Sequence, residues 1–239
     1  MPQNTNLNVS PYFDDFVDSK NYHKVLFKPG FPVQARELTT LQSILQNQVE
    51  KFGQHFFKEG SMVIPGGTTY DDEYFSVKID PNFLNIPVSN YTKVLVDNAI
   101  RIKGETSGAE AVVVNRITSS ESVDGFDTLY VKYIKSGVDG VTSAFLDGEN
   151  LITLSNINYL NTSIAADSQF ARCIVSDATS VGSAFSVSEG IYFIRGFFVT
   201  NVTSTIILDQ YTNEPSYRVG FLLKEETIGP SSVNSDLYD

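Results

Sequence analysis

The chain has 239 residues, of which 41% are hydrophobic and 19% charged, and its net charge is -11 with a sequence pI near 4.6. This negative charge repels phosphate backbones and anionic lipid surfaces, so binding to nucleic acids or membrane surfaces is disfavoured. One cysteine and two histidines exclude a disulfide framework and a cysteine-rich zinc site. No segment approaches the roughly 20 apolar residues of a membrane-spanning helix, so no membrane insertion is expected.

Residues 1–34 are predicted to form an extended docking arm. Pro11, Pro29 and Pro32 interrupt any helix and bias the residues before them toward extended conformations. Disordered tails contain few aromatic residues, whereas this arm is rich in them, so we expect it to dock on its own domain or on a neighbouring subunit. The aromatic residues expected to make this contact are Tyr12, Phe13, Phe16, Tyr22, Phe27 and Phe31.

A helix is predicted over residues 35–57, because apolar residues recur there in steps of three and four. They are Leu38, Leu41, Leu45, Val49, Phe52 and Phe56. The rest of the helix surface is polar but mostly uncharged, with Gln42, Gln46 and Asn47, and amides are cheaper to bury against another chain than charges are. One interpretation packs this helix across its own sheet. The other places it at an oligomer axis, with a homotrimer favoured, where Leu38, Leu41 and Leu45 join the amides in the contact.

The remaining segments are predicted to be mainly β. Residues 35–91 would hold the helix and the start of a β domain, including a strand over 73–79. Residues 92–154 show short β-branched runs separated by turn signals, which indicates an inserted small β-barrel. Its expected strands are 94–96, 99–102, which continues or follows the first, 111–114 and 129–134.

Residues 155–228 would complete the β domain, with strands at 184–188, 191–199, 204–208 and 217–223. Gly196, inside the second of these, indicates a bulge or a close backbone approach. Residues 229–239 would be a linker to a C-terminal continuation. The predicted fold class is therefore α+β: mainly β with one long helix, as an antiparallel meander or sandwich carrying the inserted barrel.

Catalytic patterns are not apparent in the sequence. Gly66-Gly67 lacks the lysine of a phosphate-binding loop, and residues 104–108 lack the spacing of a serine-hydrolase elbow. His23 and His55 are interpreted as packed or capping side chains, and Cys173 as a core residue. The acidic groups are interpreted as solvated residues or strand caps; they are Asp14, Asp15 and Asp18, and Asp71, Asp72 and Glu73. We therefore predict no catalytic, cofactor-binding or metal-binding residues and no enzyme activity.

Several phrases of the sequence resemble one known family. They are 21–30, 33–38 and 41–46 near the N-terminus, 58–61, 104–111 with 147–149, and 189–199. Together they resemble tailed-phage virion proteins that carry a domain of unknown function and occur in tail-fibre or baseplate-associated proteins, including those of T4-like cyanophages. Members usually continue beyond the point where this sequence stops. The resemblance implies assembly rather than catalysis.

The expected function is that of an N-terminal adaptor that attaches a tail fibre or baseplate component to the phage tail by protein–protein contacts. The expected location is the virion, assembled in the host cytoplasm, and the expected partners are other tail proteins and copies of the same chain. A different class remains open: a host-surface glycan-binding module, in which the inserted barrel presents Tyr130 and Tyr133. A virion depolymerase would need an acid pair that includes Asp71 or Asp72.

Overall fold

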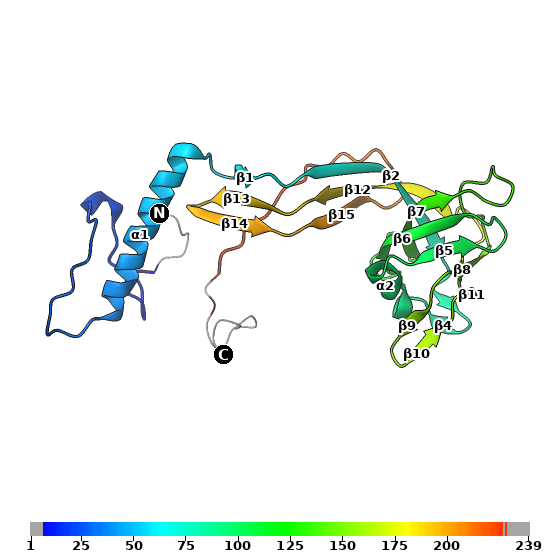
Figure 1. Cartoon of the computed structure of the whole chain (residues 1–239), viewed down its shortest axis with the longest axis horizontal. Helices are drawn as coiled ribbons and strands as arrows, with labels where there is room; N and C mark the ends of the chain where they lie inside the picture. The colour runs from blue at the N-terminus through cyan, green and yellow to red at the C-terminus, as the bar shows by residue number, and fades with distance from the viewer. Residues whose placement is uncertain (1–6, 227, 229–239) are drawn as a thin grey trace. The chain divides into compact units, whose positions relative to one another are not determined.

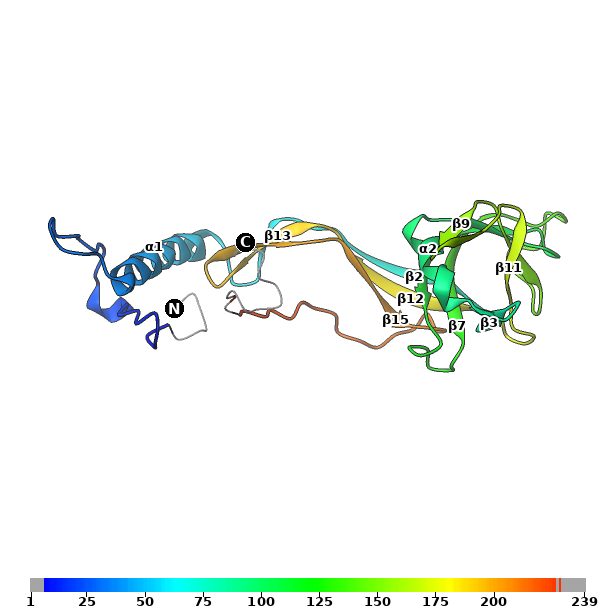
Figure 2. The same ribbon diagram turned by 90° about the horizontal axis from the view of Figure 1, so that it is seen from below.

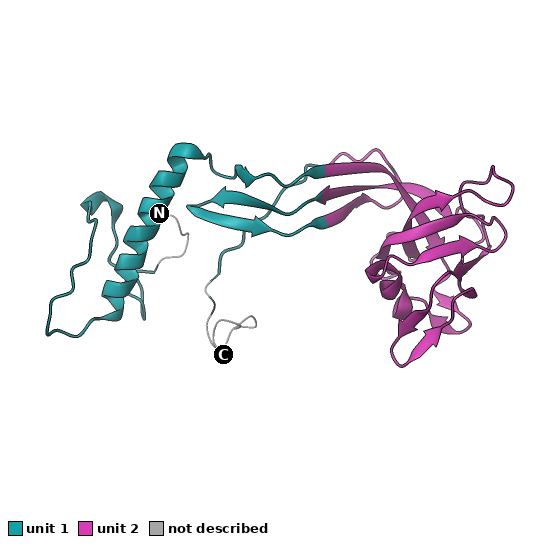
Figure 3. Cartoon of the chain, in the orientation of Figure 1, with its two compact units in different colours: residues 1–68, 187–204, 218–239 teal, residues 69–186, 205–217 magenta. Residues whose placement is uncertain are grey.

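The computed structural model describes residues 7–226 and residue 228, and it contains two compact units (Figure 1, Figure 3). Unit 1 comprises 1–68, 187–204 and 218–239, and unit 2 comprises 69–186 and 205–217. The predicted linker over 229–239 lies outside the described residues. The sequence-based boundaries at residues 34, 91, 154 and 228 stay predictions.

Unit 1 combines one long helix with a small antiparallel sheet. A short 3-10 helix, η1 (Asp18–Lys20), precedes α1 (Ala35–Phe56), which occupies the segment with the apolar three-and-four spacing. The sheet has the order β1-β13-β14, formed by β1 (Met62–Ile64), β13 (Gly190–Ile194) and β14 (Phe197–Asn201).

The segment 191–199, predicted as one strand, is a hairpin. Ile194 pairs with Phe197, and the two residues between them, Arg195 and Gly196, have φ values of 50° and 82°. Positive φ at both central residues is the geometry of the two-residue hairpin turn that best matches strand twist. Gly196 therefore belongs to a turn and not to a strand interior.

Unit 2 is built on an eight-stranded sheet with the order β11-β8-β5-β6-β7-β2-β12-β15. Its strands are β2 (Thr68–Ile79), β5 (Arg101–Gly104), β6 (Glu110–Ile117), β7 (Asp127–Lys135), β8 (Asn150–Thr153), β11 (Ser168–Arg172), β12 (Thr179–Val187) and β15 (Ser204–Asp209). Two small hairpins are formed by β3 (Asn82–Phe83) with β4 (Ile86–Pro87), and by β9 (Ile157–Tyr159) with β10 (Thr162–Ile164).

The eight-stranded sheet curls back toward its own edge. An isolated antiparallel bridge joins Ile79 of β2 to Cys173, which directly follows the edge strand β11. Figure 2 shows the curled part of the sheet, in which β2, β7 and β11 are labelled. A small barrel confined to residues 92–154 is not confirmed, because the strands of that range share their sheet with β2 and β11 from outside it. The coarser expectation of a mainly β protein with antiparallel pairing is confirmed.

A second helix, α2 (Ser89–Asp97), corrects the expectation of a single helix. Residues 94–96 were expected in a strand because Val-Leu-Val favours extended backbone. The apolar side chains that become buried are those of the N-cap Val88 and of Tyr91 and Leu95, in steps of three and four, and this spacing places them on one side of the helix. Burial against the sheet therefore outweighs the local preference of two valines.

A third correction concerns residues 217–223. They were predicted to form a strand, but the described residues from 217 to 226 contain neither helix nor strand. Part of this segment lies against the unit 1 hairpin: the rings of Tyr192 and Phe221 are 5.2 Å apart, and Arg195 Nη1 lies 3.1 Å from Glu225 Oε2.

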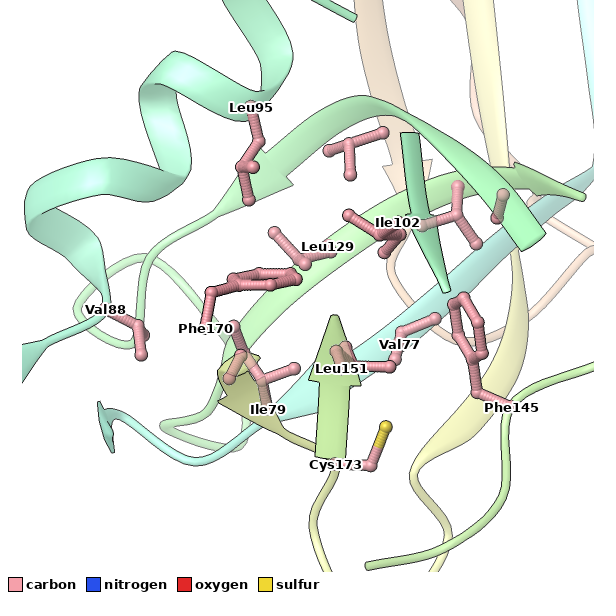
Figure 4. Close-up of a cluster of buried hydrophobic side chains, with 14 of the residues drawn as sticks. Val77, Ile79, Val88, Leu95, Ile102, Leu129, Phe145, Leu151, Phe170 and Cys173 are labelled. Atoms are coloured by element: carbon pink, nitrogen blue, oxygen red, sulfur yellow. The ribbon is translucent and has the colours of Figure 1, made fainter. Parts of the chain in front are cut away.

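The hydrophobic core belongs to unit 2. Side chains from α2 and from the strands between β11 and β2 meet around Phe170. Figure 4 shows Leu95 of α2 and Val88, which directly precedes α2, facing Phe170, Leu129 and Ile79. The hydroxyl group of Tyr91 donates a hydrogen bond to the carbonyl of Phe170 at 2.5 Å, so the buried polar end of this aromatic residue is satisfied.

Candidate interaction surfaces

α1 begins and ends with specific backbone contacts. The backbone N–H of Gln34 donates to Glu37 Oε2 at 2.9 Å, and the N–H of Phe57 donates to the carbonyl of Gly53 at 2.8 Å. The Glu37 carboxylate is also favoured near the positive end of the helix dipole. These contacts fix the extent of the helix but not the face that it buries.

The buried face of α1 is set by two glycines. A Cβ atom on Gly53 would lie 2.3 Å from the ring of Phe193, and a Cβ on Gly196 would lie 2.7 Å from Glu50 Cβ. The helix and the β13–β14 hairpin therefore approach more closely than any larger residue allows at these positions. Gln46 Nε2 donates to the carbonyl of Gly196 at 2.8 Å. The close backbone approach predicted at Gly196 is thus present.

The inward residues of α1 are Ile44, Asn47, Glu50 and Gly53, all of them buried. α1 thus packs against the sheet of its own unit, but through Gln46, Glu50 and Gly53 rather than through its spaced apolar residues. Of the three amides expected to meet another subunit, Asn47 is buried and Gln46 is bound to the hairpin of its own chain, whereas Gln42 is exposed.

The apolar residues of α1 form what we call the α1 stripe: Leu38, Leu41, Leu45, Val49, Phe52 and Phe56. Leu41 is half-buried, and the others are exposed by 50%, 57%, 44%, 69% and 63% in chain order. The rings of Phe52 and Phe56 lie 4.9 Å apart and contact one another rather than a core. A stripe of this kind is the part of an amphipathic helix that normally faces a packed interior.

The arm is attached to α1 by three aspartates. Asp14 is buried and accepts a hydrogen bond from the hydroxyl of Ser43; Asp15 pairs with Arg36; and Asp18 lies 2.6 Å from Lys51 Nζ. These acids were predicted to be solvated or capping residues, so their role in holding the arm is a correction. Ser43 lies seven residues after Arg36, and Lys51 lies eight residues after Ser43. That spacing, close to whole helical turns, is the available signal that the three residues share one side of the helix.

The aromatic residues of the arm lie outside these polar contacts. Phe16 is half-buried, and the remainder are exposed, namely Tyr12, Phe13, Tyr22, Phe27 and Phe31. Lys28 Nζ lies 4.5 Å from the centre of the Phe31 ring. The arm therefore binds its own helix through carboxylates and leaves most of its aromatic surface uncovered.

The residues proposed to present a glycan site in unit 2 are not available for one. Tyr130 is fully buried and stacks on Tyr74 with ring centres 4.9 Å apart, and burial raises the pKa of its hydroxyl. Tyr133 is half-buried against the core, and its hydroxyl accepts the backbone N–H of Phe145 at 3.1 Å. Neither ring can serve as an exposed stacking platform.

Unit 2 does have a polar, open depression of about 470 Å³ between the end of α2 and the β8–β9 connection. Asn98, Arg101, Ser155, Asn156 and Asn158 line it together with Val94, Ala99 and Ile100. Its polar groups are amides, a hydroxyl and a guanidinium, which suit neutral or anionic hydroxylated ligands.

The glycine-rich loop at 104–109 has a structural role. Glu149 is buried, and its carboxylate accepts the backbone N–H groups of Thr106, Ser107 and Leu146 and the Ser107 hydroxyl, at 2.7–3.0 Å. A Cβ on Gly104 would lie 2.5 Å from Glu149 Oε1. This loop therefore closes around a carboxylate of its own chain.

The single cysteine thiol is also enclosed by its own chain. Cys173 is buried in the core as expected, and burial, with Glu149 and Asp147 nearby, raises the pKa of its thiol to about 12. Over residues 7–226 and 228, no three acidic, histidine or cysteine side chains gather as a metal site would require. The helices in that same part of the chain are too short or too polar to cross a membrane.

Residues 10–125 match the model of a family described as a domain of unknown function, DUF4815. The chain is similar to that family over the arm, α1 and the part of unit 2 up to the connection between β6 and β7. The resemblance to a domain of unknown function is thus shown for this region, and the description assigns it no activity. Neither a curated protein nor a solved structure matches the chain.

Proposed function

We propose that this protein is a structural component of a phage tail, an adaptor that attaches a fibre or baseplate element through protein–protein contacts. In this proposal it is assembled in the host cytoplasm, resides in the virion, and acts as a homo-oligomer, with a trimer favoured. The observation that carries the proposal is the large apolar surface of unit 1, on the arm and on the α1 stripe.

The magnitude of this exposure favours a binding role. Full burial of one Leu or Phe side chain contributes about 1.5–3 kcal/mol relative to exposure. Soluble monomers rarely expose contiguous apolar patches above a few hundred Å², and larger ones mark interaction sites. Aromatic side chains are also enriched among the residues that dominate binding energy at interfaces. The phage assignment itself rests on the resemblance of the sequence phrases.

The test uses particles of the phage that encodes the chain. Immunogold labelling of purified virions should place the protein at the tail, and peptides of the chain should be found in those particles by mass spectrometry. Particles made with Tyr22→Asp and Phe27→Asp should lose the attached fibre or baseplate element. Leu84→Asp, at an exposed apolar position of unit 2, is the matched control and should not. Absence of the protein from purified particles would overturn the proposal.

A glycan-binding module is the second candidate, and the observation that favours it is the polar depression beside α2. Because neither tyrosine of β7 is available to contact a glycan, the candidate site is instead the surface around Arg101 and Asn156. Binding of the full chain to a glycan array that disappears in Arg101→Ala and persists in Lys132→Ala would support it. An array without binding would remove it.

A further inference from the structure

We propose that the α1 stripe is a self-association surface, whose occupant is the α1 stripe of a second copy of this chain. The inference rests on the proposed function in assigning unit 1 to assembly, and it names the partner and the residues. It differs from the contact expected from the sequence, because Gln46 binds the chain's own hairpin and Asn47 is buried.

The other sides of α1 are already occupied. The hairpin covers the side that carries Gln46, Glu50 and Gly53. The arm binds Arg36, Ser43 and Lys51. The stripe is the remaining side, and its three-and-four spacing is the pattern by which helices pack along one another.

The charged residues of α1 do not oppose the approach of a second copy at the stripe. α1 has four charged residues, and each has a contact within the chain: Arg36 with Asp15, Glu37 at the helix start, Glu50 against the hairpin, and Lys51 with Asp18. The stripe itself carries none of the chain's net charge of -11. Two copies can therefore approach at this surface without bringing like charges together.

The polar residues that flank Leu45 are uncharged amides. Gln42 and Gln48 are both exposed, and they lie about one helical turn before and after Leu45. An amide both donates and accepts hydrogen bonds, so identical glutamines from two copies can pair, whereas identical charges cannot. The stripe is thus complementary to itself, and it lacks the charges that would steer a different partner.

The exposed apolar area of the stripe is large enough for a stable interface. Six large apolar side chains, each exposing on the order of 100 Å², would bury roughly 600 Å² on each copy and roughly 1,200 Å² in total. This reaches the lower end of the range found for stable, specific interfaces. The exposed aromatic residues of the arm can add to it.

Cysteine cross-linking tests the contact directly, because the single native cysteine, Cys173, is fully buried. The full chain carrying Leu45→Cys is oxidised and separated without reductant. We expect covalent dimers of the chain, at least tenfold more than from Leu160→Cys, an 85% exposed apolar position of unit 2. Cross-linking no greater than that of this control would overturn the inference.

Light scattering behind a sizing column provides the second readout. The wild-type chain should have the mass of two or more copies, and Leu45→Glu with Phe52→Glu should reduce it to one. Leu84→Glu with Leu160→Glu should leave the wild-type mass unchanged, and circular dichroism establishes that each variant is folded. A single-copy mass for the wild type, or a folded stripe variant that keeps the multimer, would contradict the inference.

These outcomes are separate from those of the proposed function. A chain that self-associates through the stripe but is absent from virions supports this inference and overturns the tail assignment. A chain present at the tail as isolated copies, without cross-links at position 45, does the reverse.

Discussion

Phe170 in unit 2 is fully buried, whereas Phe52 in unit 1 is 69% exposed. The contrast holds for the two units as a whole. Among the described residues, unit 1 contributes only Ile44, Val187 and Phe193 to the buried apolar set, and both hydrophobic clusters lie in unit 2. Unit 2 is organised as a self-sufficient domain, while unit 1 places its large side chains where another chain can cover them.

The difference teaches how to separate stability from assembly in one polypeptide. Burial inside a chain contributes to its free energy of unfolding, whereas an exposed apolar side chain contributes only when a partner binds. Substitutions in unit 2 should therefore change the stability of the isolated chain, and substitutions on the exposed surfaces of unit 1 should change its association.

The largest expected effect comes from the two phenylalanines. Phe170→Ala should lower the free energy of unfolding by about 3–5 kcal/mol, because it leaves a cavity in a packed core. Phe52→Ala should change it by no more than about 0.5 kcal/mol when measured on isolated chains. Urea unfolding followed by circular dichroism makes the comparison. Equal losses in the two variants would break the distinction between the units.

The next effect concerns the carboxylate inside unit 2. Glu149→Ala should cost about 2–4 kcal/mol, because it leaves several buried donors around residues 104–107 and 146 without an acceptor. Glu73→Ala, at an exposed position of β2, is the matched control and should be nearly neutral. A neutral Glu149→Ala would mean that water replaces the carboxylate at no cost.

A pH effect should arise at Asp124, also in unit 2. Burial alone would raise the pKa of this carboxyl, but hydrogen bonds from Lys78, Ser122 and Tyr211 lower it to about 2. The folded pKa is below the unfolded value of about 3.9, so the contribution is present above pH 4 and is lost as pH falls toward 2.

Asp124→Asn should therefore reduce the free energy of unfolding by roughly 1–2 kcal/mol at pH 7, with the difference from wild type shrinking as the pH falls from about 4 to about 2. Asp167→Asn, at another exposed turn of unit 2, serves as the control. A difference that stays constant over this pH range would show that the ionised carboxylate is not the source.

The smallest expected effect lies within unit 1 and sharpens its description. Gly53→Ala would normally favour a helix by about 0.5–1 kcal/mol, but its methyl group would overlap the Phe193 ring. We expect faster amide exchange in α1 and in the β13–β14 hairpin, with little change in unit 2. Slower exchange in α1 would show that the ring moves aside and that the close approach is not required. Gln48→Ala, at an exposed position of α1, is the control.

Sequence reasoning was most successful where the signal is local. The spacing of apolar residues places a helix over α1, and turn residues separate β6 and β7 near their observed bounds. It failed at α2, where two valines favoured a strand, and at residues 195–196, where a hairpin turn lies inside an unbroken apolar run. In both cases the outcome depends on what the segment packs against.

The candidate surfaces show the same limit. The aromatic content of the arm could be recognised, and all five exposed α1 stripe residues could be placed on one face. The partners of Asp14, Asp15 and Asp18 could not be recognised, because a carboxylate in an irregular segment has no periodicity that points to its cation. Tyr130 and Tyr133 were misjudged because they point to opposite faces of β7 and both faces are covered by packed clusters, which the strand sequence does not reveal.

By itself, the sequence determined that this chain is mainly β, that one long helix carries a regular apolar stripe, and that its only thiol is suited to a core. Tertiary structure alone decided which side of that helix faces inward. The physical reason is that a helical period fixes which residues share a face, whereas the choice of face depends on close contact. Gly53 and Gly196 provide that contact by letting the hairpin approach the polar side of α1, which leaves the apolar side exposed.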